Sequence, residues 1–238
     1  MEWGDLIWAL GTLGMEGPMP ELLRKVPDFC PRQRMNCIQQ VANLKVRACI
    51  PEIRKSLKAE EAFLIEEAAL ALGWLQDQPS IPELRSLLLS TDQGIRISAA
   101  QALCLMGERD GAGALLNEDT NHFFVLNRLR QPALWNRLSE IPQRETARGS
   151  IRELLERLSK SSGITMDLPP KNGPWRTGLE EGFTWPSRHG KTSALDGISS
   201  ISEVDDLGFL FEADRIRILS SEDYKRFWHE WWGSESRK

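Results

Sequence analysis

The densest group of aromatic side chains lies near the end of the chain, in the segment YKRFWHEWW. The spacing i, i+3, i+4, i+7 of one helix face is filled by Tyr224, Phe227, Trp228 and Trp231. Such a stripe favours packing on the sheet expected before it, and it also suits an exposed anchor for a partner or a membrane surface. Trp232 lies off the stripe and is the better candidate for exposure. We keep Trp228, Trp231 and Trp232 as candidate partner-binding residues.

A run of arginines in the middle of the chain is the second group that could do chemistry. Its members are Arg128, Arg130, Arg137, Arg144, Arg148, Arg152 and Arg157. Guanidinium groups attract phosphate, nucleic acid or an acidic protein. Interspersed glutamates, such as Glu153 four residues before Arg157, favour an ordinary solvated helix face instead. We keep Arg128, Arg130 and Arg137 as candidates for contact with a partner.

Other polar residues give weaker signals. His189, in SRHGK, precedes an expected helix, where an anion could meet backbone amides, but the glycine spacing of a phosphate loop is missing. The adjacent carboxylates Glu66–Glu67 and Glu180–Glu181 point in different directions on a helix, which is unsuited to acid/base catalysis. Neither a metalloprotease, nor a serine-hydrolase, nor a dinucleotide motif occurs. We therefore predict no catalytic residue, no cofactor and no enzymatic activity.

Cysteine and histidine usage argues against a structural metal site. The chain has 4 Cys and 3 His, and no two cysteines form a C-x-x-C pair. Which pairs could form disulfides depends on compartment and geometry. We predict no metal ligands.

Composition bounds the class of protein. The 238 residues include 41% hydrophobic and 27% charged residues and carry a net charge of −4, which favours a folded protein and disfavours one that coats nucleic acid. No apolar run approaches the roughly 20 residues of a membrane span, and the acidic opening MEWGDLIWALGTLG does not resemble a signal peptide. We expect a soluble protein, cytoplasmic by default, or periplasmic or envelope-bound if this is part of a longer secreted chain.

The first half of the chain is built from an internal sequence repeat. Pro20-Glu21-Leu22, Pro51-Glu52-Ile53 and Pro82-Glu83-Leu84 are spaced by 51 − 20 = 31 and 82 − 51 = 31 residues. Each unit reads as a helix pair: a first helix begins at the proline, and a second helix carries small apolar residues such as Ala68 and Ala99. Cys37 and Cys104 fall in these small-residue columns, so we expect both to be buried. The chain opens with a helix of the second type, from Gly4 to Leu13.

These repeats resemble short HEAT-like repeats of the type found in phycobilisome lyases, with the pattern IPEL…L followed by A.ALG.L. The likeness covers residues 4–116. It implies an α-solenoid with a binding surface along one side. Two rival functions stay open: an enzyme of HEAT-like fold, such as a bilin lyase or a DNA glycosylase, and a nucleic-acid adaptor that uses the basic run Arg128–Arg157.

The spacing of apolar residues changes after Pro132, where we expect the domain boundary. LWNRLSEI alternates like a half-buried strand, Ile151 to Gly163 reads as a helix, and ITMDLP and FTWPS read as short strands. A helix over 195–204 and a hairpin around Ala213-Asp214 complete the order β-α-β-β-α-β-β. This order resembles the short N-terminal domain of secretins and TonB-dependent transducers over 134–220. The resemblance implies docking to other envelope proteins.

Together these features predict a mainly α chain with an α+β part. A HEAT-like α-solenoid with a 31-residue period is expected over 1–131. A small α+β sandwich-type domain, closed by the aromatic helix, is expected over 132–238. The predicted function is a bacterial non-enzymatic scaffold or adaptor for protein partners, with nucleic acid an improbable partner.

Overall fold

The computed structural model describes residues 3–26, 30–118, 123–142, 147–169, 182–185, 193–202 and 207–235. The chain divides into two compact units, Met1–Asp119 and Thr120–Lys238. This division lies upstream of Pro132, because α9 (Leu126–Arg130) packs against strand β4 (Leu207–Phe211) of the second unit. The domain limits 1–131 and 132–238 stay a prediction. None of the described helices combines the length and the apolar character that a membrane span needs.

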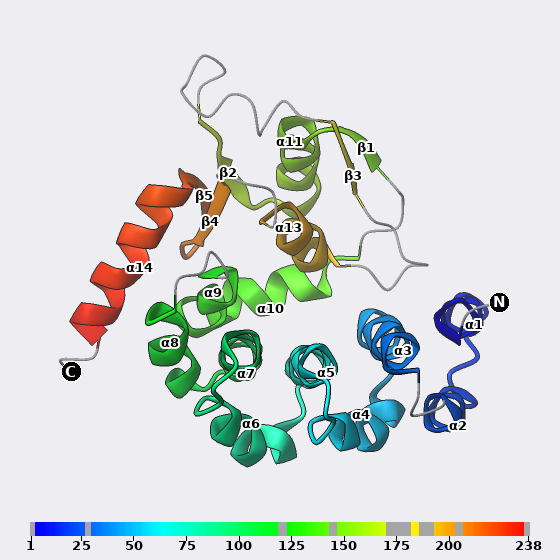
Figure 1. The fold of residues 1–238 in the computed structure, drawn as a ribbon. Helices are drawn as coiled ribbons and strands as arrows, with labels where there is room; N and C mark the ends of the chain where they lie inside the picture. The colour runs from blue at the N-terminus through cyan, green and yellow to red at the C-terminus, as the bar shows by residue number, and fades with distance from the viewer. Residues whose placement is uncertain are drawn as a thin grey trace. The chain divides into compact units, whose positions relative to one another are not determined.

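The first unit is an array of helices in two layers (Figure 1). One layer holds the second-type helices α1 (Trp3–Thr12), α3 (Pro31–Asn43), α5 (Ala62–Trp74) and α7 (Gln93–Leu105). The other holds the first-type helices α2 (Met19–Lys25), α4 (Ile50–Ser56) and α6 (Ile81–Leu87). The 3-10 turns η1 (Arg47–Cys49) and η2 (Gln78–Ser80) precede α4 and α6, and α8 (Arg109–Leu116) follows α7. Helix bounds keep the predicted register, since 81 − 50 = 31 and 105 − 74 = 31.

Helix starts and ends repeat with the same period. A proline lies in the first turn of α2, α4 and α6, where its missing N–H costs no hydrogen bond. The second-type helices all end in a left-handed residue, with φ of 71°, 57°, 56° and 89° at Gly14, Lys45, Gln76 and Gly107. The following amide bonds back over the last turn, as in Met15 N to Leu10 O, 2.9 Å, and Glu108 N to Leu103 O, 2.9 Å. These are Schellman turns, which reverse the chain toward the next first-type helix.

Small residues let neighbouring second-type helices approach closely. A Cβ at Gly73 of α5 would lie 2.7 Å from Cα of Ala102 in α7, closer than atoms can pack. Cys37 and Cys104 are fully buried, as the repeat predicts. Burial raises the pKa of the Cys37 thiol to about 12, so this cysteine stays protonated and unreactive.

Ion pairs on the first-type side join each first-type helix to the loop that follows the second-type helix of the same repeat. Arg54 donates to both carboxylate oxygens of Asp77, with Nε–Oδ2 at 2.7 Å and Nη2–Oδ1 at 2.5 Å. One period later Arg85 pairs with Glu108, Nη2–Oε2 at 2.5 Å, and also with Asp110. Because these side chains cross-link each first-type helix to the loop of its own repeat, they fix the geometry of the helix pair.

The second unit mixes short strands with helices. Its strands and crossing helices are β1 (Ala147–Ser150), α11 (Ile151–Ser162), β2 (Thr165–Asp167), β3 (Gly182–Trp185), α13 (Ala194–Ser202), β4 and β5 (Arg215–Ser220). From α11 onward, the described elements keep the expected order α-β-β-α-β-β. β1 pairs with β3, and a separate mixed sheet has the order β2-β5-β4, in which Phe209 faces Ile218 across the hairpin. The predicted Gly163 cap of α11 is confirmed, with φ of 65°.

The first predicted strand of this unit is wrong. LWNRLSEI lies in α10 (Pro132–Glu140), and the strand β1 begins only at Ala147. Leu134, Trp135 and Leu138 are buried together at the i, i+1, i+4 spacing of a helix face. Pro132 separates two helices, because α9 ends at Arg130 and α10 begins at Pro132, a position where proline is well tolerated.

The chain's last described element is the aromatic helix α14 (Ser221–Glu235), which packs on β4 and β5. The approach is close at Gly208 of β4, where an added Cβ would overlap the ring of Tyr224. Predicted packing of this helix on the preceding sheet is therefore seen at its buried stripe, Tyr224 and Trp228.

Candidate interaction surfaces

A buried asparagine joins α9, β4 and α14 in the second unit. Asn127 has no exposed surface. Its Nδ2 donates to Phe209 O at 2.7 Å, Phe124 O (of η3, Phe123–Val125) at 3.0 Å and Tyr224 Oη at 3.1 Å, while its Oδ1 accepts from Phe211 N at 2.9 Å. Burial raises the pKa of Tyr224, whose hydroxyl donates to Phe209 O at 3.1 Å. Sequence reasoning missed Asn127, although an asparagine following FFVL is a polar residue in an apolar run.

Two of the predicted partner-binding residues, Arg130 and Trp228, make contacts inside the second unit. Arg130 donates from Nη1 to Phe211 O, and its guanidinium lies 5.0 Å from the ring centroid of Phe227. Burial lowers the pKa of Arg130, and the negative charge of Glu212 opposes this effect only in part. Trp228 is fully buried, with ring centroids of Phe227 and Trp231 each 5.3 Å away. Trp228 therefore has no surface to offer a partner in this conformation.

The other sequence candidates do not converge on one site. Trp231, the last member of the aromatic stripe, and its neighbour Trp232 are both half-buried, with ring centroids 6.2 Å apart. Arg137 donates from Nη2 to Ser162 O at 2.8 Å, where it caps the carboxyl end of α11. Arg128 is half-buried in α9, and His189 lies outside the described residues. Among the described candidates, Arg137 is thus exposed although it caps α11, and Arg128, Trp231 and Trp232 keep part of their surface for a partner.

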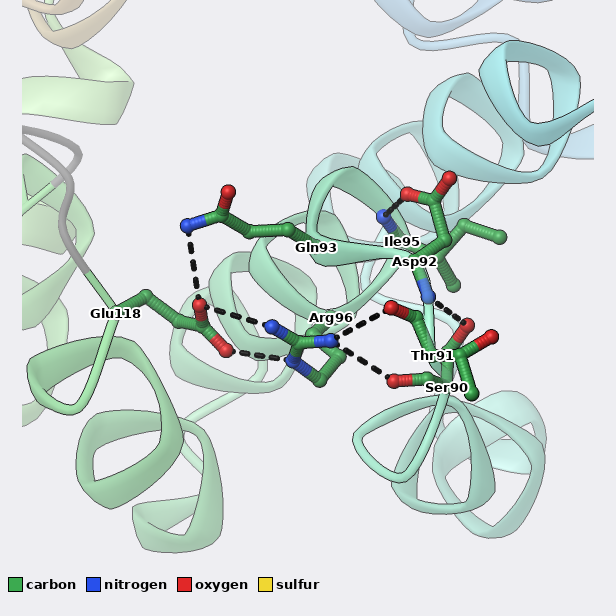
Figure 2. A network of polar contacts seen from close by, with 7 residues as sticks. All are labelled: Ser90, Thr91, Asp92, Gln93, Ile95, Arg96 and Glu118. Atoms are coloured by element: carbon green, nitrogen blue, oxygen red, sulfur yellow. Dashed lines mark hydrogen bonds and ion pairs between the residues drawn. The ribbon is translucent and has the colours of Figure 1, made fainter.

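A polar network closes the end of the first unit (Figure 2). Arg96 of α7 binds the Glu118 carboxylate through Nε at 2.6 Å and Nη2 at 3.2 Å, and its Nη1 donates to Ser90 O and Thr91 O. Gln93 adds a bond to Glu118 at 3.3 Å. Since Nε, Nη1 and Nη2 of Arg96 are all engaged, this network fixes the loop before α7 and the residues after α8 instead of binding a ligand.

The carboxylates of α5 show the clearest electrostatic strain in the array. Burial, and then the charge of Glu66, raise the pKa of Glu67 from 4.5 to about 7. Burial and the charge of Asp92 raise the pKa of Glu66. Among the described residues, no three His, Cys, Asp or Glu side chains gather as metal ligands. The raised pKa values of Glu66 and Glu67 therefore bear on the stability of the array.

Exposed apolar side chains gather at the start of the array, a feature that sequence reasoning missed. Among the described residues, the exposed large hydrophobics are Trp8, Leu13, Met15 and Leu89, and the first three belong to α1 and the turn that follows it. Leu13 is 71% exposed, whereas its equivalents Leu44 and Leu75 are 1% and 2% exposed.

Comparison with known proteins supports the architecture of the first unit. Residues 19–104 match the family model for HEAT repeats, in agreement with the helix pairs described above. The C-terminal likeness to secretin and TonB-dependent modules stays a prediction. No curated protein matches the chain.

Proposed function

We propose that this protein is a non-catalytic scaffold that binds other proteins through its HEAT-like array. HEAT repeats generally mediate protein–protein interaction. The observation that carries the proposal is the apolar surface of Leu13 and Met15, because large apolar side chains grouped on a surface mark interaction sites.

The use of polar side chains also supports a scaffold. In the described part of the array, Arg54, Arg85 and Arg96 are each paired with carboxylates of their own unit. Burial raises the pKa of the Cys49 thiol to about 12, as it does for Cys37, which removes the nucleophilic thiolate that an enzyme would need.

The second unit would extend this role to a second partner. Its sequence resembles a secretin-type module, and we propose on that basis docking within a bacterial envelope assembly. Trp231 and Trp232 supply half-buried aromatic surface on α14, and tryptophan is enriched in interface hot spots. A chain with one binding surface in each unit would hold two macromolecules together.

The test is a crosslinking pull-down with three versions of the full chain as bait. These are the natural chain, a Leu13→Glu/Met15→Glu variant and a Trp232→Ala variant. Because both first-unit positions are at least half exposed, the double variant should fold normally while losing a captured protein. Trp232→Ala should lose a different one. Capture of only nucleic acid that moderate salt removes, or capture that neither variant changes, would overturn the scaffold proposal.

A further inference from the structure

Charge is distributed unevenly along the helical array of the first unit. Residues 22–58, which include most of α2 and all of α3 and α4, hold nine Lys and Arg but only two Asp and Glu. Residues 59–118, from α5 to α8, hold three Lys and Arg but ten Asp and Glu. The second unit, 120–238, holds nearly equal numbers, 18 and 17, so its net charge is too small to neutralise either part. The array therefore has a basic half and an acidic half.

The two halves meet along one edge of the array. We call it the loop edge, because it is formed by the loops that lead from each first-type helix to the next second-type helix. Lys25 ends α2 and Arg32 begins the first turn of α3, Lys58 and Glu60 lie between α4 and α5, and Asp92 lies between α6 and α7. All five residues are exposed. Since α3, α5 and α7 pack side by side and begin at this edge, three cations are followed by two carboxylates along it.

These charges are only weakly neutralised within one chain. Arg32 and Glu60 form no ion pair with another described residue. Lys25 and Lys58 each contact one carboxylate, at 2.9 and 3.8 Å, but their own side chains are 63% and 78% exposed. Because water screens such exposed pairs, they contribute little and leave the cations accessible to a stronger partner.

The acidic half of the loop edge has two further features that suit a cationic partner. The Glu66 carboxylate reaches the start of α7, where a Cβ added at Gly94 would lie 2.5 Å from its Oε1. Burial and the charge of Asp92 raise the pKa of Glu66, which a nearby cation would lower again. Leu89, between α6 and α7, is 87% exposed and adds apolar surface at the same edge.

The order of charges along the loop edge is self-complementary. In a dimer with a two-fold axis the two edges run antiparallel, so the basic half of each copy faces the acidic half of the other. An axis near the start of α5 sets Lys58 of each copy opposite Glu60 of the other, and Arg32 opposite Asp92. A partner of one charge sign would satisfy only half of the edge. A segment that continued the stack of helices at either end would lengthen the edge and leave α3 to α7 uncovered.

We propose that the loop edge is a self-association surface, through which two copies of this chain pair antiparallel, with the basic half of each on the acidic half of the other. The contact is electrostatic, so it weakens as salt screens the charges. It is separate from the surface of Leu13 and Met15. It goes beyond the scaffold function, because one assembly then presents two arrays and two second units.

Sedimentation velocity of the full chain measures this association directly. We expect a dimer at about 100 µM protein in about 50 mM NaCl, with a dissociation constant that rises at least about tenfold in about 500 mM NaCl. Lys58→Glu and Glu60→Lys each place like charges opposite one another in the dimer, so each should weaken it at least about tenfold. Glu230→Lys, at an exposed position of α14, changes the net charge as Glu60→Lys does and should leave the dimer intact.

Mixing the two reversed chains is the decisive arm. In a dimer of the Lys58→Glu chain with the Glu60→Lys chain, the two substituted positions face each other with opposite charge, and the other pair is natural. The mixture should therefore dimerise although neither chain does alone, and this recovery also shows that both variants fold. A natural chain that stays monomeric in about 50 mM NaCl, a dimer that neither reversal weakens, or a mixture that stays monomeric would each overturn the inference. The scaffold proposal would still stand, because its pull-down depends on Leu13, Met15 and Trp232.

Discussion

Asn127 joins three elements that are far apart in the chain, since Phe209 and Tyr224 follow it by 82 and 97 residues. Removing a buried side-chain amide costs more free energy than its hydrogen bonds contributed. Its former partners stay buried, where they bond neither to the protein nor to water. Asn127 bonds three main-chain groups, Phe124 O, Phe209 O and Phe211 N, and of these Phe209 O also accepts from Tyr224 Oη. The residue is thus a stability determinant of the second unit.

Asn127→Ala should lower the free energy of unfolding by about 3 kcal/mol. The measurement is urea unfolding followed by tryptophan fluorescence, because Trp228 is buried in contact with Tyr224. Asn136→Ala, at an exposed position of α10, is the matched control and should be nearly neutral. A cost for Asn127→Ala within about 0.5 kcal/mol of the control would contradict the assignment.

At the scale of elements, the second-type helices depend on one left-handed residue at each end. Gly107 adopts φ of 89°, and a Cβ there would meet no atom within 4 Å. Any cost of Gly107→Ala therefore reports backbone strain alone. Lys45 and Gln76 hold the same conformation without glycine, so the array already tolerates such strain at two of its four turns.

Gly107→Ala should lower the free energy of unfolding by about 1 kcal/mol, which thermal or urea unfolding resolves. Gly17→Ala is the control, because Gly17 is exposed, has open space around its Cα and does not adopt positive φ. That variant should be neutral or slightly stabilising. Equal effects of the two substitutions would show that the turn is not held in the left-handed conformation.

The sequence predicted the structure correctly where the fold is built from a regular repeat. The 31-residue register placed α4 to α7, because prolines and small residues recur at every period. It failed at LWNRLSEI, because Leu134 and Leu138 fit a helix face while the apolar–polar alternation also fits a strand. Asn127 and the exposed face of α1 were missed for another reason. The burial or exposure of these residues depends on contacts with residues that are distant in the chain, which spacing alone does not reveal.

At the scale of the whole molecule, paired and buried carboxyl groups act in opposite directions on pH dependence. Hydrogen bonds from Lys55 lower the pKa of Glu52, and those from Arg96 lower the pKa of Glu118. A carboxyl whose pKa is lowered on folding stabilises the protein above its unfolded pKa of 4.5, and this contribution is lost as pH falls through the folded value. Stability should therefore decline on the acid side.

Glu67 has the opposite sign. Its pKa rises from 4.5 to about 7 on folding, so between these values the folded chain holds a proton that the unfolded chain has lost. The free energy of unfolding should then fall as pH rises from 4.5 to 7, with a maximum at about pH 5 and a loss of roughly 2 kcal/mol by pH 7.5. Urea unfolding at half-unit steps from pH 3.5 to 8 measures this profile. Glu67→Gln should flatten the upper branch, and Glu60→Gln, at an exposed position, should leave it unchanged. If the natural chain instead grows more stable between pH 5.5 and 7.5, the carboxylate of Glu67 is solvated or paired with a cation, and burial does not control its charge.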